Sequence, residues 1–349
     1  MRLVGDIGGT HARFGLIDHR RAALQHLHTL RCADHEDLSA AVESYLEAIG
    51  GPCVKDAALA VATPVLGDRL QFTNNTWSVS IAQTRQRLGL TRLLVVNDLV
   101  ALALAIPHLP TDEFRQLGPG RSVPGAPIAV LGVGTGLGTA GLIQAEGSYG
   151  IAIPGEGGHM SFAPANGREM ALLSVLWARW QHVSFERLVS GQGLMNIHQA
   201  LCEVDGAAWE PVTAADLVTR AAAGDSRCEE AVDILCGVLG TAAGNFCLAI
   251  GATGGVYLGG GVVSALGNRL DQSHFRERFE AKGRFRAYLA QVPTWVITSS
   301  HPALVGLATL FERPDGGSQA PLMLGGADDP AADAATAGLR VETPRRRQD

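Results

Sequence analysis

Residues 5–13 read GDIGGTHAR and, more than any other segment, indicate how this chain folds. Apolar runs at 3–7 and 12–17 flank the glycines, which predicts two antiparallel strands joined by a glycine turn. Adjacent glycines let backbone N–H groups converge on phosphate oxygens without a Cβ in the way, and Thr10 adds a hydroxyl donor. Asp6 at the strand end can hold Mg²⁺ through water. An ordinary hairpin turn explains an isolated Gly-Gly equally well, so both interpretations stay open.

A second glycine-rich segment at 132–139 reads GVGTGLGT and again lies between predicted strands, at 128–131 and 139–143. Four alternating glycines around Thr135 are more than a turn requires, which favours a phosphate-binding loop over a glycine-rich hairpin. The segment is not a Walker loop, because no Gly-Lys-Ser/Thr follows. It is not a Rossmann turn either, because the glycine spacing differs and a strand follows.

A third segment, GGVYLGGGVV at 254–263, predicts a short strand that ends in three glycines. A flat base or ribose could lie against bare backbone there, although this segment alone is a weak signal. Glycine is abundant overall, at 43 of 349 residues, and no Gly-X-Y period or Gly/Ser linker explains the excess. We therefore expect the surplus where backbone turns sharply or approaches a ligand.

A polar pair, Asn97-Asp98, interrupts an otherwise apolar run from 93 to 106. A buried carboxylate is costly unless it is hydrogen-bonded or functional, so the pair needs an explanation. Asp98 could simply cap a helix that begins at Leu99. Capping and catalysis are compatible, because active sites of α/β proteins gather where strands lead into helices.

Three further polar residues stand out: Glu156 and His159 in PGEGGH at 154–159, and Glu186. Recognition of a sugar needs carboxylates, amides and an imidazole, because each hydroxyl both donates and accepts a hydrogen bond. Taken singly, His159 reads more readily as a structural histidine, and Glu186 as a solvated carboxylate at a helix start.

Length and composition limit the number of domains, the kinds of partner and the cellular location that we expect. At roughly 150 residues per domain, 349 residues suggest two domains. The net charge of −6 disfavours nucleic acid as a partner. Six scattered cysteines without a CxxC pair indicate reduced thiols in a cytoplasmic protein. We find no signal-peptide segment and no run of about 18 apolar residues, so export and membrane insertion are not expected.

The order of elements suggests a duplicated architecture, because two halves each open with a glycine turn between strands. In the first half, 38–49 has the spacing of an amphipathic helix, with Asp34 as its cap and glycines at its end. Prolines place a boundary near residue 110. A closing helix is expected at 303–311, and the Ala-, Asp-, Gly- and Pro-rich segment 313–349 is expected to be disordered and non-catalytic.

Taken together and in this order, these motifs resemble the actin-like ATPase superfamily, and closely the bacterial glucokinases of the hexokinase-related, non-ROK type. The match extends from about residue 3 to residue 311. The segments that carry it are 5–10, 73–77 (TNNTW), 96–98, 134–138, 154–159, 259–261 and 282–285 (KGRF).

The resemblance implies a two-domain α/β fold of the ribonuclease H-like kind with an interdomain cleft. Residues 1–110 would form a small domain, completed by a helix at 302–312, and 111–301 a large one. ATP with Mg²⁺ would phosphorylate the 6-hydroxyl of glucose, the entry step of glycolysis, with Asp98 as general base. The residues expected to hold the sugar are Asn97, Asp98, Glu156, His159 and Glu186. Those expected at the nucleotide are Gly5, Asp6, Ile7, Gly8, Gly9, Thr10, Gly134, Thr135, Gly136, Gly259 and Gly260, with Asp6 also near Mg²⁺.

One departure from the family concerns the first loop, which usually reads Gly-Gly-Thr-Asn-Ala-Arg, whereas this chain has His11 in the Asn place. An imidazole is bulkier than an amide, so nucleotide affinity and the choice of phosphoryl donor can differ. Two alternatives stay open: a kinase for another hexose, and a sugar-sensing regulator of the same superfamily. The regulator is disfavoured because the first loop begins at Gly5, which leaves no room for an N-terminal DNA-binding domain. Similar enzymes are often homodimers.

Overall fold

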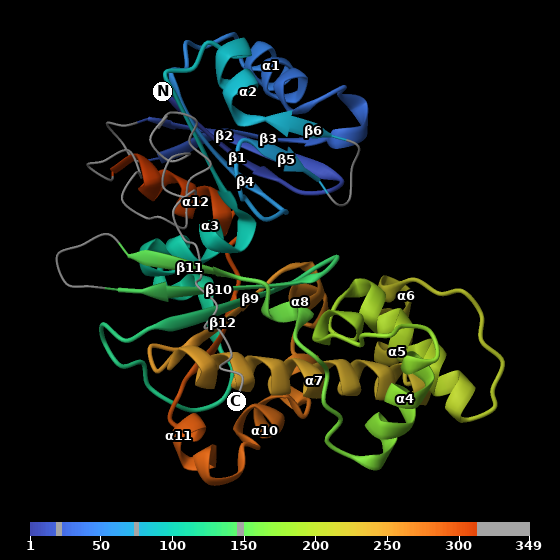
Figure 1. Cartoon of the computed structure of the whole chain (residues 1–349). Helices are drawn as coiled ribbons and strands as arrows, with labels where there is room; N and C mark the ends of the chain where they lie inside the picture. The colour runs from blue at the N-terminus through green and yellow to red at the C-terminus, as the bar shows by residue number, and fades with distance from the viewer. Residues whose placement is uncertain (19–22, 73–76, 145–149, 313–349) are drawn as a thin grey trace, which may run out of the picture.

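The computed structural model describes residues 1–18, 23–72, 77–144 and 150–312. Residues 73–76 of the TNNTW motif and the segment 313–349, expected to be disordered, lie outside the described residues. The chain forms two large sheets with two helices between them, and a helical region lies beside the second sheet (Figure 1).

The first sheet has the order β3-β2-β1-β4-β7. β1 and β2 are antiparallel, as the sequence predicts, whereas β1, β4 and β7 are parallel. One face packs on the outer helices α1 and α2, and the other faces the second sheet (Figure 1). The elements are β1 (Arg2–Ile7), β2 (His11–Asp18), β3 (Ala23–Arg31), α1 (Leu38–Ala48), β4 (Asp56–Val61), α2 (Ile81–Arg87) and β7 (Arg92–Asn97), with a separate ribbon of β5 (Arg69–Gln71) and β6 (Ser78–Ser80).

The second sheet has the order β11-β10-β9-β12-β13-β8. β9, β10 and β11 are antiparallel neighbours, and β9, β12 and β13 are parallel. Its strands are β8 (Phe114–Gln116), β9 (Ile128–Val133), β10 (Leu137–Ile143), β11 (Ile151–Gly155), β12 (Val256–Gly259) and β13 (Thr294–Ile297).

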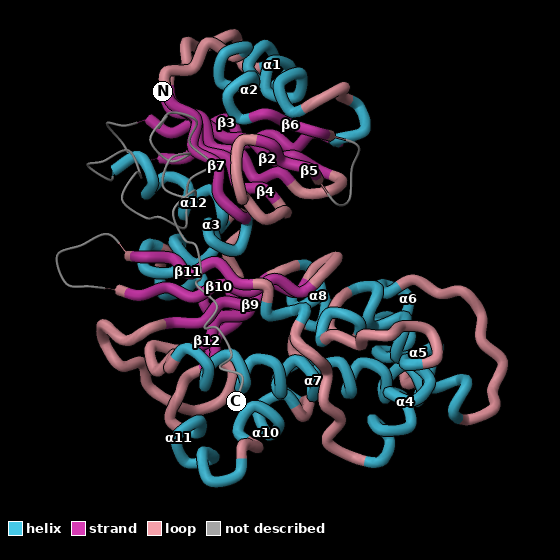
Figure 2. The backbone as a smooth tube through the Cα atoms, in the orientation of Figure 1, coloured by secondary structure: helices cyan, strands magenta, loops and turns pink. Residues whose placement is uncertain are grey.

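The two sheets repeat one topology, which supports the duplicated architecture expected from the sequence. In each sheet three antiparallel strands are extended by two parallel ones. In each half the last parallel strand leads into a helix between the sheets: α3 (Asp98–Ala105) follows β7, and α12 (Pro302–Thr309) follows β13. Figure 2 shows the two groups of magenta strands with these helices between them.

α3 and α12 belong to one apolar cluster that also contains residues of both sheets, such as Val96 and Val130. The helices touch closely, because a Cβ at Gly306 of α12 would collide with the Ala101 carbonyl of α3. The final helix therefore packs back onto the first part of the chain, as the resemblance implies. A 3-10 turn, Leu310–Glu312, extends it to the predicted end.

The helical region surrounds the 25-residue helix α7, and many residues of α7 are buried in the apolar cluster that joins these helices to the second sheet. By length and composition α7 could cross a membrane, but its burial among other helices makes this weak support for a span. The helices are α4 (Gly167–Trp177), α5 (Gly191–Val204), α6 (Ala214–Ala222), α7 (Ser226–Ile250), α8 (Gly261–Leu266), α9 (Arg269–Gln272), α10 (Phe275–Glu280) and α11 (Arg286–Ala290).

The predicted cap of the first helix is wrong by three residues, and the helix after the Asn97-Asp98 pair begins one residue earlier than Leu99. Asp37, not Asp34, caps α1, because Asp37 Oδ1 accepts a hydrogen bond from Ala40 N at 2.7 Å. At the start of α3, Asn97 occupies the cap position and Asp98 is the first helical residue; Leu99 N donates to both Asn97 Oδ1 and Asp98 Oδ1, each at 2.9 Å. The short strands β5, β6 and β8 and the exposed strand β3 were not predicted, because their apolar runs are brief or interrupted.

Candidate active site

The carboxyl ends of β1, β4 and β7 lie side by side because these strands are parallel. β1 brings Asp6 to this edge of the sheet, and β7 brings Asn97. The Asn97 Nδ2 group donates to the carbonyls of Val61 and Thr63, each at 3.5 Å, while Oδ1 caps α3. Asn97 thus fixes the start of α3 relative to the chain that follows β4.

Asp98 is the first residue of α3, directly beyond this edge. Its Oδ1 accepts a hydrogen bond from Leu99 N at 2.9 Å, and among the described residues no cationic side chain pairs with it. Burial raises the pKa of Asp98 to about 7, and the charges of Asp6 and Glu156 add to the rise. A carboxylate that changes charge near neutral pH is suited to general-base catalysis.

Asp6 pairs with Arg13 of β2, with 3.2 Å between Oδ2 and Nη1. The strands set this pair, because Asp6 and Arg13 are direct partners in the β1–β2 register. Burial raises the pKa of Asp6 above its ordinary value, and the charges of Arg13 and His301 offset part of the rise. Neither Arg13 nor His301 belongs to the site set predicted from the sequence.

The first glycine turn is closed by a hydrogen bond from Gly8 N to His11 O at 3.0 Å. Cys32 N donates to Thr10 O at 2.9 Å and joins the turn to the end of β3. Gly5 has a different reason to be glycine, since a Cβ there would lie 2.8 Å from Phe14 and Leu59 side chains in the core. Ile7 is also buried in that core. Gly8, Gly9 and Thr10 are therefore the members of this segment that form the turn.

The second glycine segment forms a loop between β9 and β10, closed by Gly134 N and Gly136 O at 2.9 Å. Gly191 N donates to Gly134 O at 2.9 Å, which joins the loop to the start of α5. Glu186 Oε2 accepts from Leu137 N at 2.9 Å, and a side chain at Gly136 would collide with this carboxylate. One Glu186 oxygen thus binds the loop, a role that the sequence did not indicate.

Glu156 precedes a 3-10 turn, Gly157–His159, that packs on β10. A Cβ at Gly158 would collide with the Leu137 carbonyl, so only glycine allows this approach. Glu156 is thereby placed where its charge acts on Asp98. His159 is exposed, and within the described residues its side chain forms no hydrogen bond with the other predicted sugar residues.

In the third glycine segment, close packing explains why two positions are occupied by glycine. Gly260 has a φ of +98°, and a Cβ there would collide with the backbone of Val133, next to the second loop. At Gly259 a Cβ would lie 3.2 Å from Leu102 of α3. The end of β12 therefore lies against both β9 and α3, at the same edge as the second loop.

The chemistry of Asp6 and Asp98 fits a divalent cation. Two partly buried carboxylates repel each other, and hard oxygen donors are the ligands that Mg²⁺ prefers. Asp6 would be the residue nearest the ion. No group of three or more His, Cys, Asp or Glu side chains converges within the described ranges.

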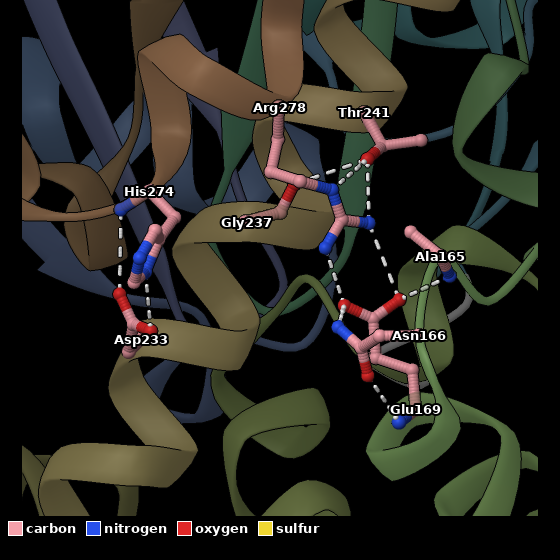
Figure 3. Close-up of polar contacts among 8 residues, drawn as sticks. All are labelled: Ala165, Asn166, Glu169, Asp233, Gly237, Thr241, His274 and Arg278. Atoms are coloured by element: carbon pink, nitrogen blue, oxygen red, sulfur yellow. Dashed lines mark hydrogen bonds and ion pairs between the residues drawn. The ribbon is translucent and has the colours of Figure 1, made fainter. Parts of the chain in front are cut away.

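A second polar cluster lies among α4, α7 and α10 (Figure 3). Here the buried Glu169 forms a two-pronged ion pair with Arg278 and accepts hydrogen bonds from Ala165 N at 2.8 Å and Asn166 Nδ2 at 3.2 Å. Arg278 Nη2 also donates to Thr241 Oγ1 at 2.9 Å. We call these five residues the Arg278 cluster. Its polar groups satisfy one another, which is typical of a structural brace.

Comparisons with known proteins agree with the geometry. The sequence matches the glucokinase family over residues 3–314. It is 48% identical to a glucokinase of Aromatoleum aromaticum over 316 residues, covering 89% of this chain and 95% of that protein. It is also 48% identical to a glucokinase of Chromobacterium violaceum over 308 residues, 88% of each. A solved glucokinase from an Antarctic psychrotroph has a TM-score of 0.79 at 34% identity, covering 89% of this chain and 99% of that one.

The chain therefore belongs to the glucokinase family. The α/β fold of the actin-like ATPases predicted from the sequence is confirmed.

Proposed function

We propose that the protein is an ATP-dependent glucokinase, which transfers the γ-phosphoryl group of ATP to the 6-hydroxyl of glucose and releases ADP and glucose 6-phosphate. Family membership supports the reaction class. The observation that carries the mechanism is Asp98, a partly buried carboxylate at the head of α3 whose pKa is raised to about 7.

Asp98 acts as the general base. The sugar 6-oxygen forms a bond to the γ-phosphorus while the bond from phosphorus to the ADP oxygen breaks, and Asp98 takes the hydroxyl proton. In phosphoryl transfer a protein mainly positions reactants and stabilises charge, so no covalent intermediate on the enzyme is needed. The position of Asp98 close enough to Asp6 for their charges to interact suits this role.

The sugar is held by Asn97, Glu156, His159 and Glu186 together with Asp98. Backbone contacts already fix Asn97, which leaves it rigid for recognition. Glu186 uses Oε2 on the second loop, so Oε1 is the atom we assign to a sugar hydroxyl. Each such hydrogen bond discriminates against a sugar that lacks the matching hydroxyl.

The two glycine loops bind the phosphates of ATP. Because the N–H groups of Gly8 and Gly134 are already used inside their loops, we assign phosphate contacts to the N–H groups of Gly9, Thr10, Thr135 and Gly136. Gly259 and Gly260 lie near the adenosine, and Gly5 and Ile7 support the first turn from within the strand. Mg²⁺ near Asp6 would neutralise charge on the transferring phosphoryl group.

Residues 1–110 with the helix at 302–312 form the small domain of this proposal, and 111–301 the large one. Water could compete with the sugar as phosphoryl acceptor, so we infer that glucose closes the domains around an interdomain cleft. Small-angle scattering should show a smaller radius of gyration with glucose; an unchanged radius would contradict closure.

The proposed location and partners follow from the composition, and the proposed oligomeric state follows from the resemblance to similar enzymes. We propose a cytoplasmic enzyme whose partners are glucose and ATP, without nucleic acid or membrane partners, and a homodimer as in similar enzymes. Size-exclusion chromatography with light scattering would measure the oligomeric state.

The test of the function is ADP release measured with glucose, mannose, fructose, N-acetylglucosamine and acetate, each with ATP or polyphosphate. We expect turnover that requires both glucose and ATP. Preference for another hexose would support the alternative kinase. Sugar binding without any turnover would support a sugar-sensing regulator instead.

A further inference from the structure

The internal repeat assigns corresponding places to the starts of α3 and α12. Each helix follows the last parallel strand of its sheet and lies between the two sheets. Asn97 is the cap residue of α3, and His301 stands at the cap position of α12. The first half thus brings Asn97 and Asp98 to the site, and the second half brings His301.

The direction of α12 shows where His301 lies. Beyond its far end, the Phe311 ring centroid lies 5.0 Å from Arg2 Cζ and 5.4 Å from Arg92 Cζ, at the amino ends of β1 and β7. At its middle Gly306 touches α3. Its first residues therefore lie toward the carboxyl ends of the same strands, where Asp6 lies. The charge of His301 acts on Asp6, consistent with this placement.

The His301 side chain has an unused polar atom. Its Nδ1 is shielded from solvent and has no hydrogen-bond partner within the described residues. A buried polar group left unpaired costs about 1–3 kcal/mol, so native structures satisfy such groups with a water or a ligand. His198 Nδ1 in α5 is orphaned in the same way, but it lies in the helical region beside Arg220 and Arg227 rather than at Asp6.

We propose that His301 is a donor-binding residue, whose Nδ1 hydrogen-bonds an oxygen atom held at Asp6 when the nucleotide is bound. That oxygen belongs either to a phosphate of the nucleotide or to a water on the cation; both are hydrogen-bonding oxygens in the same place. The inference rests on the proposed function for the identity of the ligand, and it gives the residue at the start of α12 a direct part in the site.

The experiment is calorimetric titration of the full-length protein with ADP, in one arm with Mg²⁺ and in the other with EDTA. The variants are His301→Asn, whose amide nitrogen can take the place of Nδ1, and His301→Gln, whose amide reaches the place of Nε2 instead. We expect His301→Gln to weaken ADP binding by roughly tenfold, the loss of one charge-assisted hydrogen bond, and His301→Asn to bind within about threefold of the wild type.

The arms separate the two oxygen sources. Weaker binding in both arms assigns the phosphate, and weaker binding only with Mg²⁺ assigns the metal-bound water. His198→Gln, which removes the other orphaned imidazole, is the matched control and should leave ADP affinity unchanged. ADP affinity within twofold of the wild type for His301→Gln in both arms would overturn the proposal, as would an equal loss in His198→Gln.

Failure of the inference and of the proposed function can be told apart, because the titration needs no catalysis. A wild-type protein that binds ADP through His301 but releases no ADP with glucose would refute the glucokinase reaction and keep the inference. Glucose-dependent turnover together with an unaffected His301→Gln would do the reverse.

Discussion

Asp98 is a partly buried carboxylate and Glu169 a fully buried one, and they have opposite surroundings. Glu169 meets a guanidinium and two further donors in the Arg278 cluster (Figure 3). Asp98 has one backbone donor and faces the negative charges of Asp6 and Glu156. Burying a charge is costly unless it is paired and hydrogen-bonded. The difference teaches that the paired carboxylate braces three helices, whereas the unpaired one is held ready to take a proton.

Among the substitutions that test this comparison, we expect the largest effect from Asp98→Asn. We expect kcat to fall by about 10³-fold, within the range for loss of a general base, while glucose affinity stays near that of the wild type. Stability should not fall, because the variant removes a charge that burial disfavours. Kinetics with calorimetric glucose binding would measure both. Lost glucose binding with unchanged kcat would refute the assignment.

At Glu169 the effect should appear in stability instead. Arg278→Met leaves a buried carboxylate unpaired, and we expect it to lower the free energy of unfolding by about 3–5 kcal/mol, with kcat unchanged while the protein is folded. Urea denaturation would measure the loss. Arg220→Gln, which breaks the exposed pair with Asp225, is the control and should cost less than about 1 kcal/mol. Equal losses in the two variants would show that the cluster is no brace.

The pH dependence sharpens the same contrast. With a pKa of about 7, Asp98 must lose its proton to act as base, so kcat/KM for glucose should fall about tenfold per pH unit below neutrality and level off above it. The stability of the protein depends on pH in the opposite direction. The pKa of Asp98 in the folded protein lies above its ordinary value near 3.9, so between about pH 4 and 7 the folded state holds a proton that the unfolded state has lost. The free energy of unfolding therefore falls as the pH rises through this range. A pH profile of kcat/KM that is flat from pH 5 to 8 would contradict the assignment.

The smallest effect is expected at His11, where the family usually has Asn. Its carbonyl closes the first turn whatever the side chain, and the side chain is exposed. His11→Asn should therefore change KM for ATP by no more than about tenfold, the equivalent of one hydrogen bond, and leave kcat and KM for glucose unaltered. Initial rates with ATP and with polyphosphate would measure donor choice. A large fall in kcat would mean that the imidazole acts in the chemical step.

Much of the fold could be predicted from local patterns. The glycine hairpins and the helix after residue 37 each follow from spacing within a few residues, and the structure has them. The strands β3, β5, β6 and β8 were missed because they are short or exposed and lack a clear alternation. These segments form strands because they pair with neighbouring strands, and a local sequence pattern does not reveal that pairing.

The candidate site likewise contains residues that the sequence could identify and residues that it could not. Asp98 could be singled out because a carboxylate inside an apolar run is anomalous in any fold. His301 could not, because a histidine before Pro302 resembles many helix starts. The packing role of Gly5 was likewise hidden, since a glycine in a motif looks alike whether its missing Cβ makes room for a phosphate or for Phe14.

The sequence by itself determined the two glycine hairpins, the presence of two similar halves and the family, because these are indicated by residues near one another in the chain. Only the tertiary structure decided which carboxylate is paired. Asp98, Asp6 and Glu156 meet through parallel strands and a turn on different sheets, and Glu169 meets Arg278 across 109 positions. Pairing and burial set the energy of a charge, and both are properties of the folded chain alone.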